Sequence, residues 1–301
     1  MVDAAFATEK RDNMKSVPGI EINDVSDVVG AEIIGLDIRD DEVVNAHWVE
    51  IQQLLKERHI LLFRDQDLDP DTLGKFALRF GEFERSVTQR ADGTVSEPVH
   101  TITNLDATGK PSATPHRNSN YFWHSDKAFL ANGSAMVMLF GMELPPNGGD
   151  TQFANMELAY EGLSEEDKAL VADLQVVHSF EHMRDNLMKR PLSDFERQTV
   201  PGPRQHPLVR TDPATGRKSL LLGMYACEVV GMPREQGQAL IERLQEHATQ
   251  PRFVYTHQWR KGDFFAWNNL TLLHRALPNY EMSNHRRIML RCGIKSRDVI
   301  Q

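Results

Sequence analysis

The last third of the chain constrains the fold most, because it consists of short β-rich segments separated by turn residues. These segments read RFVYTHQW, GDFFAWNN, TLLHRAL and RRIMLRCGI. Many short strands of this kind are typical of jelly rolls and barrels. Helical patterns lie mostly outside this region. We therefore expect an α+β protein with a jelly-roll β core and flanking helices.

The rest of the chain supplies further strands and the helices. Apolar residues at helical spacing predict helices, and short apolar runs between turn residues predict strands. The predicted helices lie at 46–58, 69–81, 156–173 and 234–247, and the predicted strands at 59–66, 121–130, 134–142, 151–154 and 174–180. The polar segment 84–120 is expected to be a long loop and is a candidate lid over a binding pocket. The segment 182–205 is a second candidate lid. The second is equally well explained as a solvated surface insert.

The absence of internal repeats and linkers favours one domain. The 301 residues fit one large domain or two small ones, and no internal repeat or linker divides them. We predict a flexible segment at 1–17 and a single domain at 18–301. The first segment lacks the apolar stretch of a signal peptide. The longest apolar run, at 135–142, is too short to cross a bilayer. A soluble, cytoplasmic protein is expected, with no membrane partner.

The charge pattern excludes a nucleic-acid partner. The net charge is −9 and the basic residues form no stripe that would follow a phosphate backbone. An acidic protein that binds a small anion must instead place individual arginines in a pocket. Cys227 and Cys292 are too few and too far apart for a disulfide framework or a CxxC site, so two buried thiols are expected. A homo-oligomer is also expected.

The stretch YFWHSDKAFL at 121–130 holds a histidine and an aspartate two residues apart. If the stretch is a strand, His124 and Asp126 point to the same face and present a nitrogen and a carboxylate to one metal ion. The alternative is a surface turn in which the pair has no function. His274, in the apolar segment WNNLTLLHRAL, is the candidate third ligand, and its own alternative is a satisfied core residue.

Two histidines and one carboxylate favour non-haem Fe(II), because that set leaves three coordination positions open. Zinc would more often take a third nitrogen or sulfur ligand, or keep only one position open for water. Copper also binds imidazole, but the carboxylate and the nearby arginines favour iron.

Arginines accompany this ligand set in the segment HRRIMLRCGI. On a strand, Arg287, Met289 and Arg291 share one face, and inward arginines need anionic partners. The Cα atoms of Arg287 and Arg291 would lie about 13 Å apart, at ~3.3 Å per residue. Both cannot hold one carboxylate without bending, so we assign Arg291 to a second anion, the primary substrate. The alternative for Arg291 is an internal salt bridge to a nearby acid.

The motifs WHSD, NGGDT, WNNLTLLH and RRIMLR, in this order, resemble the taurine/dichlorophenoxyacetate dioxygenase family. The resemblance runs from about Val28 to about Arg297. It implies an oxygenase that depends on Fe(II) and 2-oxoglutarate and that is built on a double-stranded β-helix. His124, Asp126 and His274 would be the iron ligands.

The resemblance also implies roles around the metal. Thr151 would hydrogen-bond the distal carboxylate of 2-oxoglutarate, and Arg287 would form a salt bridge to it. Asn120, Ser86 and Arg291 would contact the substrate.

The chain departs from the family's pattern at several positions, one of which is Leu270, where the family usually has an arginine. Arg85, Ser86 and Gln89 stand where the taurine branch carries a histidine and a tyrosine, which weakens a taurine assignment. The segment 267–269 reads Trp-Asn-Asn where the family has Trp-Asp-Asn, which predicts altered turn hydrogen bonding without loss of iron. Asp126 is present, which argues against a halogenase.

The implied reaction is hydroxylation of a small anionic organic substrate with dioxygen, releasing succinate and CO2. The segments ANMELAYEGL and HPLVRTDPATGRKSLLLG favour an aryloxyalkanoate-like carboxylic acid. The alternatives are an alkyl sulfonate or sulfate-ester dioxygenase of the taurine branch, a catalytically silent jelly-roll binding protein, and a zinc hydrolase on a similar barrel.

Overall fold

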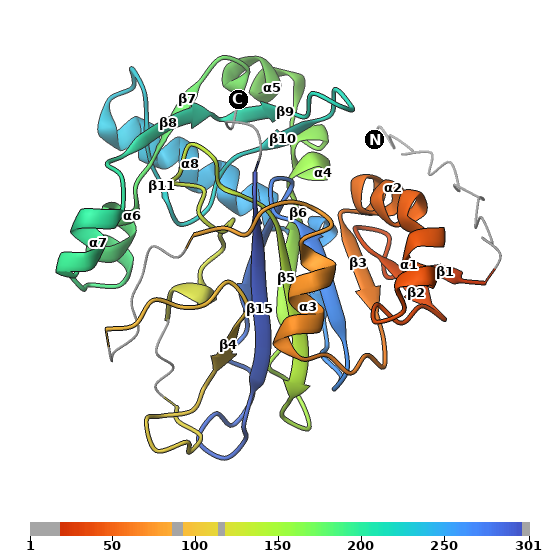
Figure 1. The fold of residues 1–301 in the computed structure, drawn as a ribbon. Helices are drawn as coiled ribbons and strands as arrows, with labels where there is room; N and C mark the ends of the chain where they lie inside the picture. The colour runs from red at the N-terminus through yellow and green to blue at the C-terminus, as the bar shows by residue number, and fades with distance from the viewer. Residues whose placement is uncertain (1–18, 86–92, 114–117, 297–301) are drawn as a thin grey trace.

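The computed structural model describes residues 19–85, 93–113 and 118–296. A large sheet crosses the centre of the molecule, with helices on its outer side and smaller sheets on its inner side (Figure 1). The segment predicted to be flexible, 1–17, lies outside the described residues. The division into this segment and one domain at 18–301 therefore stays a prediction.

The large sheet has seven strands in the order β1-β2-β3-β13-β5-β15-β4. Neighbours pair antiparallel except β2 and β3, which are parallel. Its strands are β1 (Glu21–Asp24), β2 (Ala31–Ile34), β3 (Ile60–Phe63), β4 (His100–Thr103), β5 (Ser134–Glu143), β13 (Phe264–Asn268) and β15 (Ile288–Lys295).

Three smaller sheets complete the β structure. The sheet β12-β6-β14 faces the large sheet and closes the jelly roll, while β11-β7-β8 and β10-β9 extend the fold at one end (Figure 1). Their strands are β6 (Thr151–Asn155), β7 (Gln175–His178), β8 (Arg204–Pro207), β9 (Val209–Thr211), β10 (Lys218–Leu220), β11 (Ala226–Val229), β12 (Val254–His257) and β14 (Leu272–Ala276).

The helices lie at the flanks, as predicted. The segment 156–173 forms two helices because Gly162 ends the first and the Ser164 side chain caps the second. The helices are α1 (Asp41–Ala46), α2 (Trp48–Arg58), α3 (Pro70–Ala77), α4 (Met156–Glu161), α5 (Glu165–Val171), α6 (Phe180–His182), α7 (Asp194–Thr199) and α8 (Arg234–Ala248), with shorter 3-10 or π turns η1 (Asn118–Tyr121), η2 (Met183–Leu187) and η3 (Pro251–Phe253).

The central strands read as continuous apolar runs because both of their faces are buried. In β13, Phe264 and Ala266 face α2 and α3, whereas Phe265 and Trp267 face the small sheet. In β15, Leu290, Cys292 and Ile294 face the helices. The inward face of β15 therefore carries Met289 and Arg291, which the period-two alternation predicts. This face lines the space between the two sheets, where the functional side chains gather.

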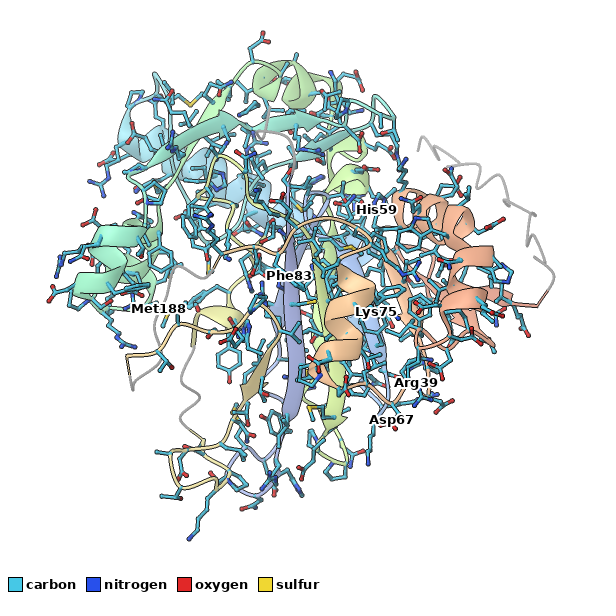
Figure 2. All side chains as sticks on the ribbon, viewed as in Figure 1. Arg39, His59, Asp67, Lys75, Phe83 and Met188 are labelled. Atoms are coloured by element: carbon cyan, nitrogen blue, oxygen red, sulfur yellow. The ribbon has the colours of Figure 1, made fainter. Side chains whose placement is uncertain are left out.

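Charged residues surround the helical layer, as Figure 2 shows for Arg39, Asp67 and Lys75. The side chain of Asp67 is 92% exposed and lies 3.6 Å from Arg39. Among the described residues, no helix combines the length and the apolar character needed to cross a membrane.

Cys292 is buried as expected, but Cys227 is only half-buried, with its thiol donating to the carbonyl of Val177. The expectation of two buried thiols is therefore half right.

Two secondary-structure predictions near the site are wrong. The stretch 121–130 is not a strand, because it forms one isolated bridge, between His124 and His274, and then turns. Lys127 has a φ of 57°, in the left-handed region, which ends the extended backbone immediately after Asp126. The polar segment 84–120 is not all loop either, since it supplies β4 and η1.

Candidate metal and 2-oxoglutarate site

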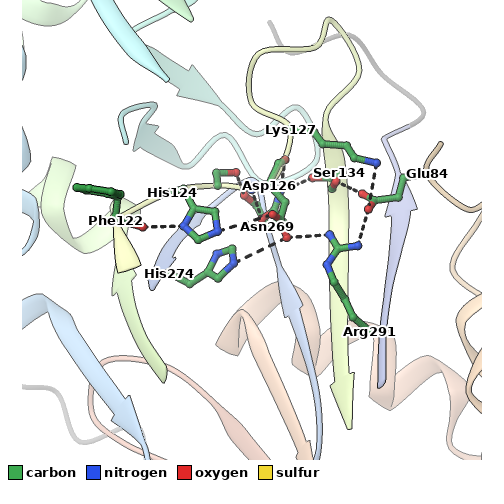
Figure 3. A network of polar contacts seen from close by, with 10 residues as sticks. Glu84, Phe122, His124, Asp126, Lys127, Ser134, Asn269, His274 and Arg291 are labelled. Atoms are coloured by element: carbon green, nitrogen blue, oxygen red, sulfur yellow. Dashed lines mark hydrogen bonds and ion pairs between the residues drawn. The ribbon is translucent and has the colours of Figure 1, made fainter. Parts of the chain in front are cut away.

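His124, Asp126 and His274 meet between the two sheets (Figure 3). Each offers one ligand atom, and these atoms all lie within 4.8 Å of one another. The two histidine backbones pair directly, with N–O distances of 3.0 and 2.8 Å. Among the described residues, this is the one group of three or more His, Cys, Asp or Glu side chains with such geometry.

A hydrogen bond orients the imidazole of His124, and the imidazole of His274 is neutral. The Nδ1 atom of His124 lies 2.7 Å from the carbonyl oxygen of Phe122. Since a carbonyl only accepts, Nδ1 carries the proton, and the lone pair of Nε2 is left facing Asp126. Burial and the neighbouring His124 lower the pKa of His274 to about 3, so its ring is neutral at neutral pH. Neutral imidazole is the form that binds a metal.

Asp126 supplies the carboxylate in its charged form. Burial alone would raise the pKa of Asp126, but Arg291 and the two histidines hold it well below its usual range. Its Oδ1 lies 3.7 Å from Nε2 of His124, and its Oδ2 lies 3.8 Å from Nε2 of His274. These gaps leave space for a cation among the three side chains. The donor set therefore fits a divalent metal ion.

The Asn269 side chain fixes the backbone that carries Asp126. Its Oδ1 accepts from the Asp126 amide at 2.9 Å, and its Nδ2 donates to the carbonyls of Asp126 and Ser134 at 3.0 and 2.8 Å. Ser125 donates to the Asn269 carbonyl at 2.5 Å. The turn before His274 is closed by Asn268, whose Oδ1 accepts from the Leu270 amide. The Asn-Asn pair thus ties the two ligand-bearing segments together.

Arg291 lies in the internal ion pair that the sequence left open as its alternative role. Its two terminal nitrogens bind protein carboxylates, one at 2.6 Å from Glu84 and one at 2.9 Å from Asp126 (Figure 3). Although burial would lower the pKa of Arg291, these two acids raise it further above its usual value. Contact with a substrate anion therefore stays a prediction for Arg291.

Arg287 offers a buried positive charge for a small anion. It lies immediately before β15, and Nε donates to the carbonyl of Gly149 at 3.1 Å. Burial lowers its pKa, and Tyr280, Tyr121 and Asp150 oppose that effect. Among the described residues, no salt bridge to Arg287 is found. A buried guanidinium without a protein carboxylate is a fitting partner for the distal carboxylate of 2-oxoglutarate.

Thr151 is the first residue of β6 and follows the turn that contacts Arg287. Its Oγ accepts from the indole nitrogen of Trp259 at 2.9 Å, which leaves the hydroxyl proton free to donate. The turn before it needs glycine: Gly148 has a φ of 73°, and a Cβ there would meet the carbonyl oxygen of Asn279 at 2.0 Å. The NGGDT motif therefore brings the Gly149 carbonyl to Arg287, two residues before Thr151.

The predicted substrate residues have mixed outcomes. Asn120 is half-buried in η1, four residues before His124, and its role stays a prediction. Ser86 lies outside the described residues. Sequence reasoning missed Glu84, Lys127 and the tyrosines beside Arg287, namely Tyr121 and Tyr280. Tyr121 and Lys127 belong to the stretch around the His-x-Asp pair, so their closeness to the predicted ligands in the sequence could have identified them as site residues.

Comparisons with known proteins agree with this geometry. The model of the family described as "Taurine catabolism dioxygenase TauD, TfdA family" matches residues 21–292. The chain belongs to the TauD/TfdA dioxygenase family. It is a dioxygenase that uses iron and 2-oxoglutarate, and the predicted family and double-stranded β-helix fold are confirmed.

Individual TauD/TfdA relatives are similar over most of the chain. The α-ketoglutarate-dependent 2,4-dichlorophenoxyacetate dioxygenase of Burkholderia sp. (strain RASC) is 35% identical over 247 residues, covering 79% of this chain and 82% of that protein. The α-ketoglutarate-dependent sulfate ester dioxygenase of Pseudomonas putida is 30% identical, covering 87% and 85%. The crystal structure of AAD-2 in complex with Mn(II) and N-oxalylglycine superposes with a TM-score of 0.82 at 32% identity, covering 94% and 98%.

Proposed function

We propose that this dioxygenase hydroxylates a small anionic organic substrate, with an aryloxyalkanoate-like carboxylic acid favoured, and releases succinate and CO2 from 2-oxoglutarate. The observation that carries the proposal is the His124, Asp126 and His274 cluster beside the buried Arg287. A silent binding protein has no chemical need for all four residues. A zinc hydrolase has no need for a site at Arg287 that binds the carboxylate of a co-substrate.

The relatives support the substrate class. The Burkholderia relative is named for 2,4-dichlorophenoxyacetate, an aryloxyalkanoate. The AAD-2 structure contains Mn(II) together with N-oxalylglycine, which is an analogue of 2-oxoglutarate. The Burkholderia relative and the AAD-2 structure both support a 2-oxo acid at the site of this chain, and the AAD-2 structure also supports a metal. The Pseudomonas relative supports the alternative substrate, a sulfate ester of the taurine dioxygenase branch.

The residues of this chain have separate tasks in the proposed reaction. His124, Asp126 and His274 hold the iron. Bound iron supplies dioxygen activation coupled to the oxidative decarboxylation of 2-oxoglutarate. Arg287 and Thr151 hold the distal carboxylate of 2-oxoglutarate, so that its keto acid end faces the iron.

The substrate must lie close to the iron, because a small displacement of the reacting C–H bond costs a large factor in rate. Asn120 and Ser86 are proposed to contact it. Arg291 can do so only if Glu84 or Asp126 gives way. A homo-oligomeric state and a cytoplasmic location complete the proposal.

Succinate formation tests the proposal directly. The protein is incubated with Fe(II), 2-oxoglutarate, dioxygen and one member of a panel of aryloxy acids, alkyl sulfonates and sulfate esters. We expect succinate in proportion to substrate consumed, highest with an aryloxy acid. Highest turnover with a sulfate ester would replace the favoured substrate by the alternative. No substrate-dependent succinate across the panel would contradict the proposed substrate class.

A further inference from the structure

We propose that Glu84 is a positioning residue for the metal ligand Asp126 and that it acts through Arg291. The proposal rests on the proposed function, because it assigns Asp126 to iron. It adds a residue that is not among the ligands and binding residues predicted from the sequence. Glu84 lies 207 residues from Arg291 in the chain, so only the fold brings them together.

Arg291 forms a bridge between Glu84 and Asp126. One terminal nitrogen donates to Oε1 of Glu84 at 2.6 Å, and the other donates to Oδ2 of Asp126 at 2.9 Å (Figure 3). The three side chains are 12%, 9% and 20% exposed, in the order Arg291, Glu84, Asp126. Charge-assisted bonds in such a shielded place fix geometry as well as charge. The guanidinium therefore sets the orientation of the Asp126 carboxylate.

Glu84 is itself held from several sides. Its Oε2 accepts from the Ser134 hydroxyl, and its Oε1 lies 3.1 Å from the ammonium of Lys127. Its backbone amide donates to the carbonyl of Gly293 at 2.9 Å. Phe83 bridges Ile294 at the same edge of β15, near the centre of Figure 2. Phe83 and Glu84 are thus anchored to the strand that carries Arg291.

Gly293 provides the space for the Glu84 carboxylate. A Cβ built on Gly293 would lie 2.3 Å from Cδ of Glu84 and 2.4 Å from its Oε2. Gly293 stands two residues after Arg291 on β15, so both positions face the same side of the strand. The absence of a side chain at Gly293 allows Glu84 to reach Arg291. The contact of Glu84 with Arg291 therefore depends on two positions of β15, Arg291 and Gly293.

This geometry determines how Asp126 meets the metal. Its Oδ2 is taken by Arg291, while Oδ1 faces His124 with no hydrogen bond among the described residues. A carboxylate held in this way offers one oxygen to the metal instead of two. Single-oxygen ligation keeps open the positions that 2-oxoglutarate and dioxygen need. Glu84 also keeps Arg291 on Asp126 by competing with any substrate anion for the guanidinium.

A purely stabilising role for Glu84 is the competing explanation, and the chain contains a matched control for it. Arg64 is likewise held by two acids, Glu32 at 2.7 Å and Asp263 at 2.8 Å. Neither acid belongs to the metal cluster. Glu32→Gln removes the charge of one of the two acids that hold Arg64, outside the metal site. Glu84→Gln makes the same change for Arg291, beside the metal site.

The test measures metal affinity rather than turnover. Apo protein is titrated with Mn(II) by calorimetry for the wild type, Glu84→Gln and Glu32→Gln, with thermal melting of each. Partners of metal ligands typically contribute 10- to 100-fold in affinity. We expect Glu84→Gln to weaken Mn(II) binding about tenfold or more, and Glu32→Gln to leave it unchanged. Unchanged affinity in a folded Glu84→Gln variant overturns the proposal, as does an equal loss in both variants.

A milder variant keeps the test decisive if Glu84→Gln does not fold. Ser134→Ala removes one hydrogen bond to Glu84 and leaves every charge in place. We expect a several-fold loss of Mn(II) affinity, and unchanged affinity overturns the proposal. Failure of the proposed function has a different signature: a wild type that binds neither Mn(II) nor 2-oxoglutarate would contradict the iron assignment itself.

Discussion

Two arginine clusters in this protein have nearly the same composition, and only one of them can hold a metal. In the first, Arg291 joins Glu84 to Asp126, beside two histidines. In the second, Arg64 joins Glu32 to Asp263, beside His257. In the sequence, His124 and Asp126 are two residues apart and His257 and Asp263 are six apart, so only the first pair matches a metal-ligand spacing. The two clusters differ in how many hydrogen-bond donors surround the carboxylate, Asp126 in the first and Asp263 in the second.

Asp263 has a full set of donors. Arg64 lies 2.9 and 2.8 Å from its two oxygens, the Arg260 amide lies 2.8 Å from Oδ2, and Nε2 of His257 lies 3.0 Å from Oδ2. His257 is also occupied on its other side, by the hydroxyl of Tyr255 at 2.9 Å. Such a network stabilises the fold and commits both oxygens of Asp263 and both ring nitrogens of His257 to protein partners.

Asp126 and its histidines have donors on one side only. Oδ1 of Asp126 and Nε2 of His124 face each other without a hydrogen bond. Nε2 of His274 lies 3.8 Å from Oδ2 of Asp126, which is also too far for a hydrogen bond. Buried polar groups left without partners are costly unless something binds them. Unsatisfied ligand atoms that converge, and not the residue types alone, mark the metal site.

The largest expected effect comes from removing a metal ligand. His124→Ala and Asp126→Ala should each abolish iron-dependent succinate formation, because two ligands cannot hold the metal in the required geometry. Circular dichroism should show an intact fold. Near-normal succinate production by either variant would mean that the metal assignment is wrong.

Breaking the second cluster should affect stability and leave the metal site intact. Arg64→Met leaves Asp263 buried, at 1% side-chain exposure, without its cation. The loss of one partner from a buried ion pair costs about 3–5 kcal/mol of unfolding free energy. Urea unfolding measures this cost, and Mn(II) titration should give the wild-type affinity. A loss of metal binding in a folded Arg64→Met variant would remove the distinction between the two clusters.

Arg287→Ala should sharply raise the concentration of 2-oxoglutarate that turnover requires. The co-substrate's distal carboxylate would lose its cation inside the protein, which costs about 2–5 kcal/mol of binding free energy. The apparent Michaelis constant for 2-oxoglutarate measures this, with Mn(II) affinity as the control. An unaltered Michaelis constant would place the co-substrate elsewhere.

The smallest effect concerns His178, a buried histidine outside the metal cluster. Burial and the neighbouring His206 lower the pKa of His178 from 6.5 to about 3. Between these values the unfolded chain binds a proton that the folded chain does not, so stability falls as pH falls below 6.5. His178→Met should reduce this slope by up to about 1.4 kcal/mol per pH unit. His285→Gln, at a half-buried position, is the control, and an unchanged slope in His178→Met would contradict the assignment.

The sequence predicted the central β structure well, and the reason is physical. Strands such as β3 and β13 are buried on both faces, so their apolar runs are long enough to recognise. It failed at 121–130, where aromatic residues around a single bridge imitate a strand and Lys127 then turns the chain. The alternation on β15 did place Arg291 on the inner face.

The partners of the site residues could not be predicted in the same way. The pairing of Glu84 with Arg291 depends on two segments that meet only in the fold. The space for it depends on Gly293, which reads in the sequence as an ordinary strand glycine. The ligand set itself was predictable because His124 and Asp126 are two residues apart and His274 follows a recognisable motif. The predicted ligands converge in the structure, while their occupancy by iron stays a prediction.

The most direct test of the difference between the two clusters is a titration of apo protein with Fe(II) and 2-oxoglutarate in the absence of oxygen. A chelate of iron with the 2-oxo acid gives a weak visible charge-transfer band, which zinc cannot give. We expect the band in the wild type and in Glu32→Gln, and its absence in Asp126→Ala. A wild type without the band, or an Asp126→Ala variant that keeps it in full, would contradict the assignment of the unsatisfied carboxylate to iron.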